Sequence, residues 1–252
     1  MPWEDSHLVC VDVSSGSVEG QRCFRRNLKE VTLQGALLSS SQRIYVPQGR
    51  SAPLAFDKTS GQPQGAVGEA GGVFCILTED EMLLAGPNHQ RASENQIRVV
   101  GAGESKALAS FSGTDRLVVD GKYAWFSIGG ELKKLDREAY LGSQQSMRQA
   151  LASVPKGQKP SEEVNQAVAD AKRVQQEAWQ WAIPCEPPLE MVKAGDALLL
   201  GFDREIRAYS AASGELLWNQ VIDAAAFGIA VAEGRVFVST DRGDIHAFGR
   251  TP

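Results

Sequence analysis

Short stretches of alternating apolar and polar residues recur along the chain, and turn-forming residues bound each of them. Alternation of this kind is typical of strands in antiparallel hairpins. The stretches return at intervals of roughly forty residues, a length typical of one supersecondary unit in a repeat protein. The five clearest copies are residues 42–46, 81–85, 121–126, 195–200 and 233–238.

A second pattern repeats in phase with the first: a β-rich run, a polar residue, and a turn of small residues that ends in glycine. Helical solenoids share this period, but their apolar residues would recur every 3.6 positions, and these do not. A period near forty with about four short strands per repeat is what a β-propeller blade requires. The residues that mark the copies are Asp12, Gly16, Asp57, Gly61, Gly103, Asp136 (whose copy lacks the glycine) and Gly214.

The predicted fold class is therefore all-β, and the repeats indicate a β-propeller with about four complete blades and two partial ones. We take residues 1–252 as one propeller or propeller fragment. The two partial blades either complete one another in a small ring or belong to a longer protein, since an open arc would leave blade faces without a partner.

One stretch, residues 142–181, interrupts the repeat. It is rich in Gln, Ala, Lys and Glu, and Ser161 precedes two acidic residues as a helix N-cap would. We predict a helical hairpin inserted in the fourth repeat. Its longer helix carries a stripe of small apolar residues that either packs on the shorter helix or docks a partner or the rest of a propeller. The stripe includes Val164, Val168, Ala171 and Val174.

The most specific phrase is Ala-Tyr-Ser-Ala-Ala-Ser-Gly-Glu-Leu-Leu-Trp at 208–218. It resembles the tryptophan-docking repeat of the pyrroloquinoline-quinone (PQQ)-type β-propellers, Ala-x-Asp-x-x-Thr-Gly-x-x-x-Trp. Serines stand where that family has Asp and Thr. The resemblance covers most of the chain outside 142–181 and is strongest over 190–249. It implies that Ala208 and Trp218 are structural, with the indole between blades, and that Trp181 serves the interrupted blade.

The resemblance does not bring the activity of the quinone dehydrogenases with it. In those enzymes the cofactor stacks against a ring formed by two adjacent cysteines, beside a calcium ion held by Glu and Asn and a catalytic Asp. The cysteines here, Cys10, Cys23, Cys75 and Cys185, are isolated in the sequence and read as small apolar residues, although a Cys10–Cys23 bridge across a hairpin stays open. We therefore predict no catalytic, metal or cofactor-binding residue, and no residue supports PQQ itself.

Charge and hydropathy argue against two classes of function, nucleic-acid binding and membrane spanning. A formal net charge of −5 argues against a general nucleic-acid binder, and no apolar run is long enough for a membrane span. The first residues do not read as a signal peptide, while the resemblance implies an extracytoplasmic or periplasmic location. We predict a non-enzymatic scaffold that binds a protein or ligand, with cell-envelope assembly as the implied setting and a protein partner or further blades as the expected contacts. The alternative is a fragment of a quinone-dependent dehydrogenase whose cofactor residues lie outside this chain.

Overall fold

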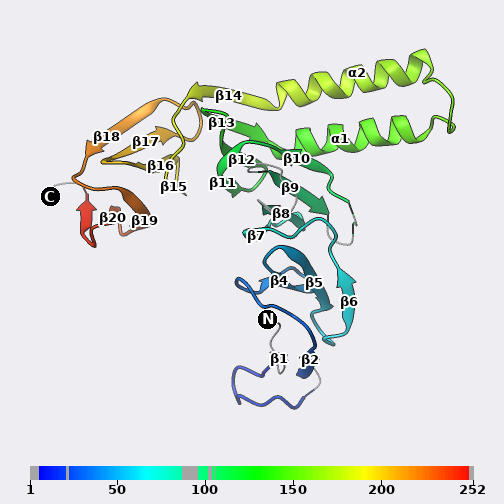
Figure 1. Cartoon of the computed structure of the whole chain (residues 1–252), viewed down its shortest axis with the longest axis horizontal. Helices are drawn as coiled ribbons and strands as arrows, with labels where there is room; N and C mark the ends of the chain where they lie inside the picture. The colour runs from blue at the N-terminus through cyan, green and yellow to red at the C-terminus, as the bar shows by residue number, and fades with distance from the viewer. Residues whose placement is uncertain (1–5, 21–22, 87–95, 102–103, 105, 250–252) are drawn as a thin grey trace. The chain divides into compact units, whose positions relative to one another are not determined.

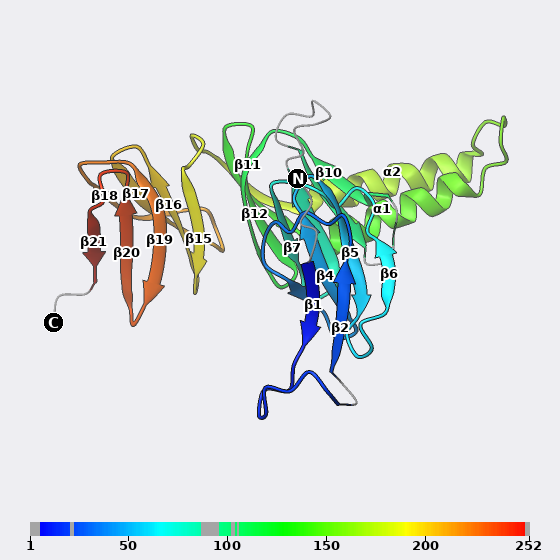
Figure 2. The same ribbon diagram turned by 60° about the horizontal axis from the view of Figure 1, so that its bottom comes forward.

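A computed structural model describes residues 6–20, 23–86, 96–101, 104 and 106–249. The chain divides into two compact units, residues 1–112 and 113–252. Within the described residues, the strands form six antiparallel sheets (Figures 1 and 2), and strands that follow one another in the sequence are neighbours in each sheet.

The first unit contains three of these sheets. The first has two strands, β1 (Ser6–Cys10) and β2 (Phe24–Leu28). The second has four: β3 (Leu38–Ser39), β4 (Arg43–Gln48), β5 (Ser51–Asp57) and β6 (Pro63–Ala66). The third also has four: β7 (Phe74–Leu77), β8 (Met82–Gly86), β9 (Ile97–Gly101) and β10 (Ala109–Phe111).

The second unit contains the other three sheets and both helices. Its first sheet has β11 (Thr114–Asp120), β12 (Tyr123–Ile128), β13 (Glu131–Asp136) and β14 (Trp179–Pro184). Its second has β15 (Glu190–Ala194), β16 (Ala197–Phe202), β17 (Glu205–Ser210) and β18 (Leu216–Val221). Its third has β19 (Ala226–Ala232), β20 (Arg235–Thr240) and β21 (Ile245–Phe248). The helices are α1 (Arg137–Ala152) and α2 (Glu162–Glu177).

This strand content confirms the prediction of an all-β chain with four complete repeats and two partial ones, because four sheets have four strands, one has two and one has three. The core lies between neighbouring sheets of each unit. In the first unit Tyr45 packs with Leu83 and Val100. In the second unit Trp125 and Leu132 pack with apolar residues of β16, such as Leu198. The alternation seen in the sequence places these side chains on the covered faces.

The helical hairpin lies between β13 and β14, but its predicted bounds of 142–181 are wrong at both ends. Helix α1 begins at Arg137, because Asp136 Oδ1 accepts the amide of Ala139 at 3.1 Å and caps the first turn. At the other end, residues 179–181 belong to β14, where Trp181 pairs with Lys134 of β13. Helices α1 and α2 lie antiparallel and side by side in both views (Figures 1 and 2).

Candidate functional site

The turns before β2, β6 and β18 share two kinds of hydrogen bond: a polar side chain accepts an amide of the turn, and the amide of the glycine donates to the carbonyl of that polar residue. Between β5 and β6, Asp57 Oδ1 accepts the amides of Thr59 at 3.0 Å and Ser60 at 2.7 Å. The amide of Gly61 donates to the Asp57 carbonyl at 2.8 Å. Its φ of 66° is a conformation that glycine adopts without a steric penalty.

The equivalent turns are built by Asp12 with Gly16 and by Ser210 with Gly214, where the polar side chain again accepts an amide of the turn. In the first of them, the Ser14 hydroxyl and the amide and hydroxyl of Ser15 lower the pKa of Asp12 to about 2. The aspartate therefore stays ionised, as an acceptor of several donors should. The predicted repeat residue Gly103 lies outside the described residues.

The helical hairpin stands where the other sheets have this short turn. The amide of Asp57 donates to the Gln62 carbonyl, and the amide of Ser210 donates to the Glu215 carbonyl, both at 2.8 Å. The amide of Asp136 makes the same bond, also at 2.8 Å, but to the carbonyl of Ala178 at the far end of the hairpin. Residues 137–178 therefore replace a turn equivalent to residues 58–62.

Several contacts hold the base of the hairpin against its sheet. Arg137 is buried, and its Nη1 donates to the Gly121 carbonyl at 2.7 Å. The Trp179 ring lies edge-on to Phe126 of β12, with centroids 5.5 Å apart, and to Tyr140 of α1, at 6.4 Å. These contacts fix the direction in which the two helices leave the sheet.

An aromatic ring closes over the glycine of the turn in two places. A Cβ atom built on Gly214 would lie 2.9 Å from Cε3 of Trp181, so the indole of the interrupted sheet covers the turn of the next sheet. In the first unit, a Cβ on Gly61 would overlap the Phe24 ring. Phe24 was not among the residues predicted from the repeat; the signal for it was an aromatic residue a few positions beyond the first small-residue turn.

Comparison with solved structures finds chains of the same architecture. BamB from Moraxella catarrhalis superposes with a TM-score of 0.51 at 12% identity, covering 97% of this chain and 76% of that one. BBS1N, solved in complex with ARL6DN, gives 0.50 at 10%, covering 98% and 74%. Hsv2p of Kluyveromyces lactis gives 0.56 at 10%, covering 90% and 64%. The chain has a β-propeller fold.

At these identities the likeness shows the fold alone. No family model matches the sequence, and no curated protein matches it. Because the fold is a β-propeller, each sheet described above is a complete or partial blade. The blade that carries the hairpin is β11–β14.

This blade also contains an unexpected buried lysine. Lys134 pairs with Trp181 at the register position where Ala208 pairs with Trp218 and Ala55 pairs with Gly65. Its Nζ lies 4.0 Å from the centroid of the Tyr123 ring and 6.0 Å from that of Trp125. The aromatic faces stabilise the ammonium group where the other two blades have a small residue. Aligning Lys-Leu-Asp with Ala-Phe-Asp and Ala-Tyr-Ser would have identified this position from the sequence.

The four residues of the predicted docking stripe have different surroundings. Ala171 is buried, and Val164 and Val168 are half-buried. Val174 remains 37% exposed, the most accessible of the four. On helix α2, Val174 is therefore the stripe residue that a partner could reach most readily.

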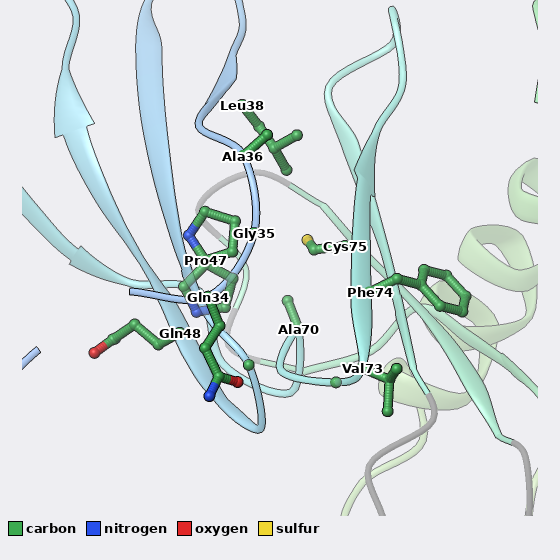
Figure 3. Close-up of a pocket in the computed structure, with 13 residues that line it drawn as sticks. Gln34, Gly35, Ala36, Leu38, Pro47, Gln48, Ala70, Val73, Phe74 and Cys75 are labelled. Carbon is green, nitrogen blue, oxygen red and sulfur yellow. The ribbon is translucent and has the colours of Figure 1, made fainter. Parts of the chain in front are cut away.

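The first unit contains a small cavity and a larger one, and two of the thiols of the chain are held neutral. A cavity of about 80 Å³ in the first unit is lined mainly by glycine, proline and apolar residues, and the Cys75 sulfur points toward the segment with Gly35 and Pro47 (Figure 3). Ligand sites usually have volumes of ~300 Å³ or more. A second, mostly apolar hollow in the same unit reaches about 330 Å³ and is lined by residues such as Leu8, Leu28 and Val46. Burial raises the pKa of Cys75, and that of Cys185, to about 11, so both thiols are neutral at pH 7.

All four cysteines are free thiols, so the Cys10–Cys23 bridge left open above is not formed. Across the part of the chain that the structure describes, no three His, Cys, Asp or Glu side chains gather as metal ligands would. Among the same residues, no helix combines the length and hydropathy needed to cross a bilayer.

We expect Trp218→Ala to lower the free energy of unfolding by about 2 kcal/mol. Full burial of an aromatic side chain would make the loss ~3–5 kcal/mol, but Trp218 is only half-buried. It packs beside Ile206 and Val238 and meets the Phe248 ring edge-on at 5.4 Å. Urea denaturation followed by circular dichroism measures the change. Trp218→Phe should recover part of the lost stability. A loss below about 0.5 kcal/mol for Trp218→Ala would show that the ring does not join the β15–β18 blade to the β19–β21 blade.

Proposed function

We propose that the chain is a non-enzymatic propeller scaffold of the PQQ-like repeat type, and that it binds a protein partner through the α1–α2 hairpin. One observation carries the proposal: a long helical hairpin occupies the place of a short turn and is held firmly at its base. Such a hairpin adds little that the blade itself needs. Long excursions from a rigid scaffold are where binding function is usually found.

The proposed repeat family is supported by the phrase at 208–218 and by the matching positions of Trp181 and Trp218. Each pairs with the residue two positions before the polar turn residue, Asp136 or Ser210. Each also follows a bulge at the same point of its ladder. A shared register of this kind favours one ancestral repeat over chance similarity.

The chemistry of the described residues supports a binding role rather than catalysis. The two thiols with a shifted pKa are held in the neutral form, whereas a reactive cysteine needs a lowered pKa. The likeness to BamB and the PQQ-type resemblance support the finer proposal of a role in cell-envelope assembly. Fractionation of host cells tests that part, because recovery in the cytoplasm alone would contradict it.

Replacing residues 137–178 with Lys-Thr-Ser-Gly-Gln, the turn of the second blade, tests the role of the hairpin. The amide of Asp57 donates to the Gln62 carbonyl just as that of Asp136 donates to the Ala178 carbonyl, so the graft should close the blade without strain. We expect cooperative unfolding to persist and the helical circular dichroism signal to disappear. Loss of cooperative unfolding would show that the hairpin belongs to the core.

Partner binding is then measured by affinity capture from the native host with the full chain, the grafted chain and two point variants. We expect Val174→Glu to reduce capture of a specific protein at least tenfold, because it places a charge on the exposed apolar position of α2. Gln176→Glu is the matched control, since it adds the same charge at a polar exposed position of the same helix. Equal capture by the full and grafted chains would refute the hairpin as the interface.

A further inference from the structure

The outermost strands of the blades differ in how well they are protected against pairing with another strand. Exposed edges are usually blunted by short length, proline, charge or a β-bulge, and glycine also weakens a strand. Strand β6 carries Pro63 and Gly65, and β2 carries two arginines. Strand β10 spans only 109–111 and β21 only 245–248, while β14 follows α2 closely in the sequence and ends in proline. Each of these strands therefore has a feature that opposes further pairing.

Strand β18 has only one of these features, a bulge at Leu217 near its start. Its sequence, Leu-Leu-Trp-Asn-Gln-Val, contains no proline, glycine or charge. It is the edge strand of its sheet, paired with β17 on one side (Figure 1). Leu217 is 56% exposed and Val221 is 66% exposed. An apolar, uncharged edge of this length is a template for another strand.

The register identifies which backbone groups face outward. Glu205 pairs with Val221, and the amide of Ile222 donates to the Arg204 carbonyl at 3.0 Å. Groups that point toward the partner strand alternate with groups that point away from it. The N–H and C=O groups of Asn219 and Val221 therefore point away from β17. Leu217 lies in the bulge at the start of the strand, with its side chain exposed.

We propose that β18 pairs antiparallel with β18 of a second copy of this chain, around a two-fold axis at Asn219. In that register, Asn219 faces Asn219 of the second copy, and Leu217 faces Val221 of the second copy. Apolar residues then meet apolar residues, and no like charges are opposed because the strand has no charge. The two four-stranded blades become one continuous sheet.

A single strand pair buries much less than the ~1,200–2,000 Å² of a typical stable interface. The dimer should therefore be weak, forming at concentrations of roughly tens of micromolar or above. This inference is independent of the proposed function, because β18 and the hairpin belong to different blades. The chain with the grafted turn should dimerise like the full chain.

Sedimentation velocity from low to high micromolar concentration tests the proposal. We expect the full chain to pass from monomer to dimer, and Leu217→Lys with Val221→Lys to remain monomeric throughout, because the new charges would face each other across the axis. Gln180→Lys with Ala182→Lys is the matched control on exposed positions of β14. It should dimerise as the full chain does. A full chain that stays monomeric, or equal dimerisation of both lysine variants, would overturn the proposal.

Disulfide trapping tests the register. Residues directly opposite in a hydrogen-bonded antiparallel pair have Cα atoms ~5.5 Å apart, within disulfide range. Asn219→Cys should therefore give a covalent dimer under mild oxidation, at least fivefold more than Gln220→Cys or the full chain with its own four cysteines. Equal trapping at 219 and 220, or trapping of neither, would contradict a two-fold axis at Asn219.

Discussion

Replacing Trp125 with alanine should lower the free energy of unfolding by about 3–5 kcal/mol, the usual loss for a large buried aromatic side chain. Trp125 is 2% exposed and packs with Leu132 of its own blade and with Leu198 and Leu200 of the next. Its Nε1 also donates to the Ala211 carbonyl at 3.0 Å, across the boundary between the two blades. The side chain therefore contributes both apolar burial and a hydrogen bond between blades.

Trp125→Phe is the control that separates these two contributions. Phenylalanine keeps most of the apolar contact but leaves the Ala211 carbonyl without its donor, which should cost ~1–3 kcal/mol. Chemical denaturation of the three proteins, followed by far-ultraviolet circular dichroism, measures both differences. If Trp125→Ala loses less than about 1.5 kcal/mol, the blades of the second unit are not joined through this indole.

Replacing Gly214 with alanine should destabilise the chain by about 2–4 kcal/mol. Two effects add: the φ of 77° disfavours any residue with a Cβ, and the new methyl group would lie 2.9 Å from the Trp181 ring. Overpacking of this kind costs ~1–3 kcal/mol beyond the backbone term. The measurement is the midpoint of urea unfolding.

Gly234→Ala provides the comparison, because Gly234 has a φ of 71° but no atom within 4 Å of the position that the new methyl group would take. It should lose only the backbone term, about 1 kcal/mol. The double variant Gly214→Ala with Trp181→Ala should lose less than the sum of its single variants, since the ring that clashes is gone. Equal losses at 214 and 234 would show that Trp181 does not cover the turn.

These two predictions concern the same boundary, where β11–β14 meets β15–β18. Trp125 lies within the buried cluster between the blades, and Trp181 covers the turn at Gly214. The blade that carries the hairpin is therefore joined to its neighbour by two indoles. Under the proposed function such rigidity would favour binding, because less order has to be gained when a partner binds.

Much of the fold could be predicted from local sequence signals. Strands such as β12 and β20 show apolar alternation between turn residues, and the polar residues Asp57 and Ser210 precede glycines that need a positive φ. These features depend on neighbouring residues only, which is why the number of strands and the positions of the turns could be predicted from the sequence. The start of α1 was missed because Asp136 looks the same whether it opens a turn or caps a helix.

Less of the candidate site could be predicted from the sequence, because burial depends on residues far apart in the sequence. Val174 and Ala171 look alike in a helical stripe, yet one is left accessible and the other is buried. From the sequence alone, Lys134 would be taken for a surface residue. In the structure, the rings of Tyr123 and Trp125 lie beside its ammonium group. Periodicity assigns a side chain to a face, but the packed structure decides what covers that face.

The sequence by itself determined the β-rich repeat, its period and the positions of its turns, because alternation, glycine and short polar side chains act over a few residues. Only the tertiary structure decided that Trp181 covers Gly214, that Phe24 covers Gly61, and that β18 is left as an apolar, uncharged edge. Those outcomes depend on strand register and on the approach of neighbouring sheets. They arise from long-range packing, which no local pattern specifies.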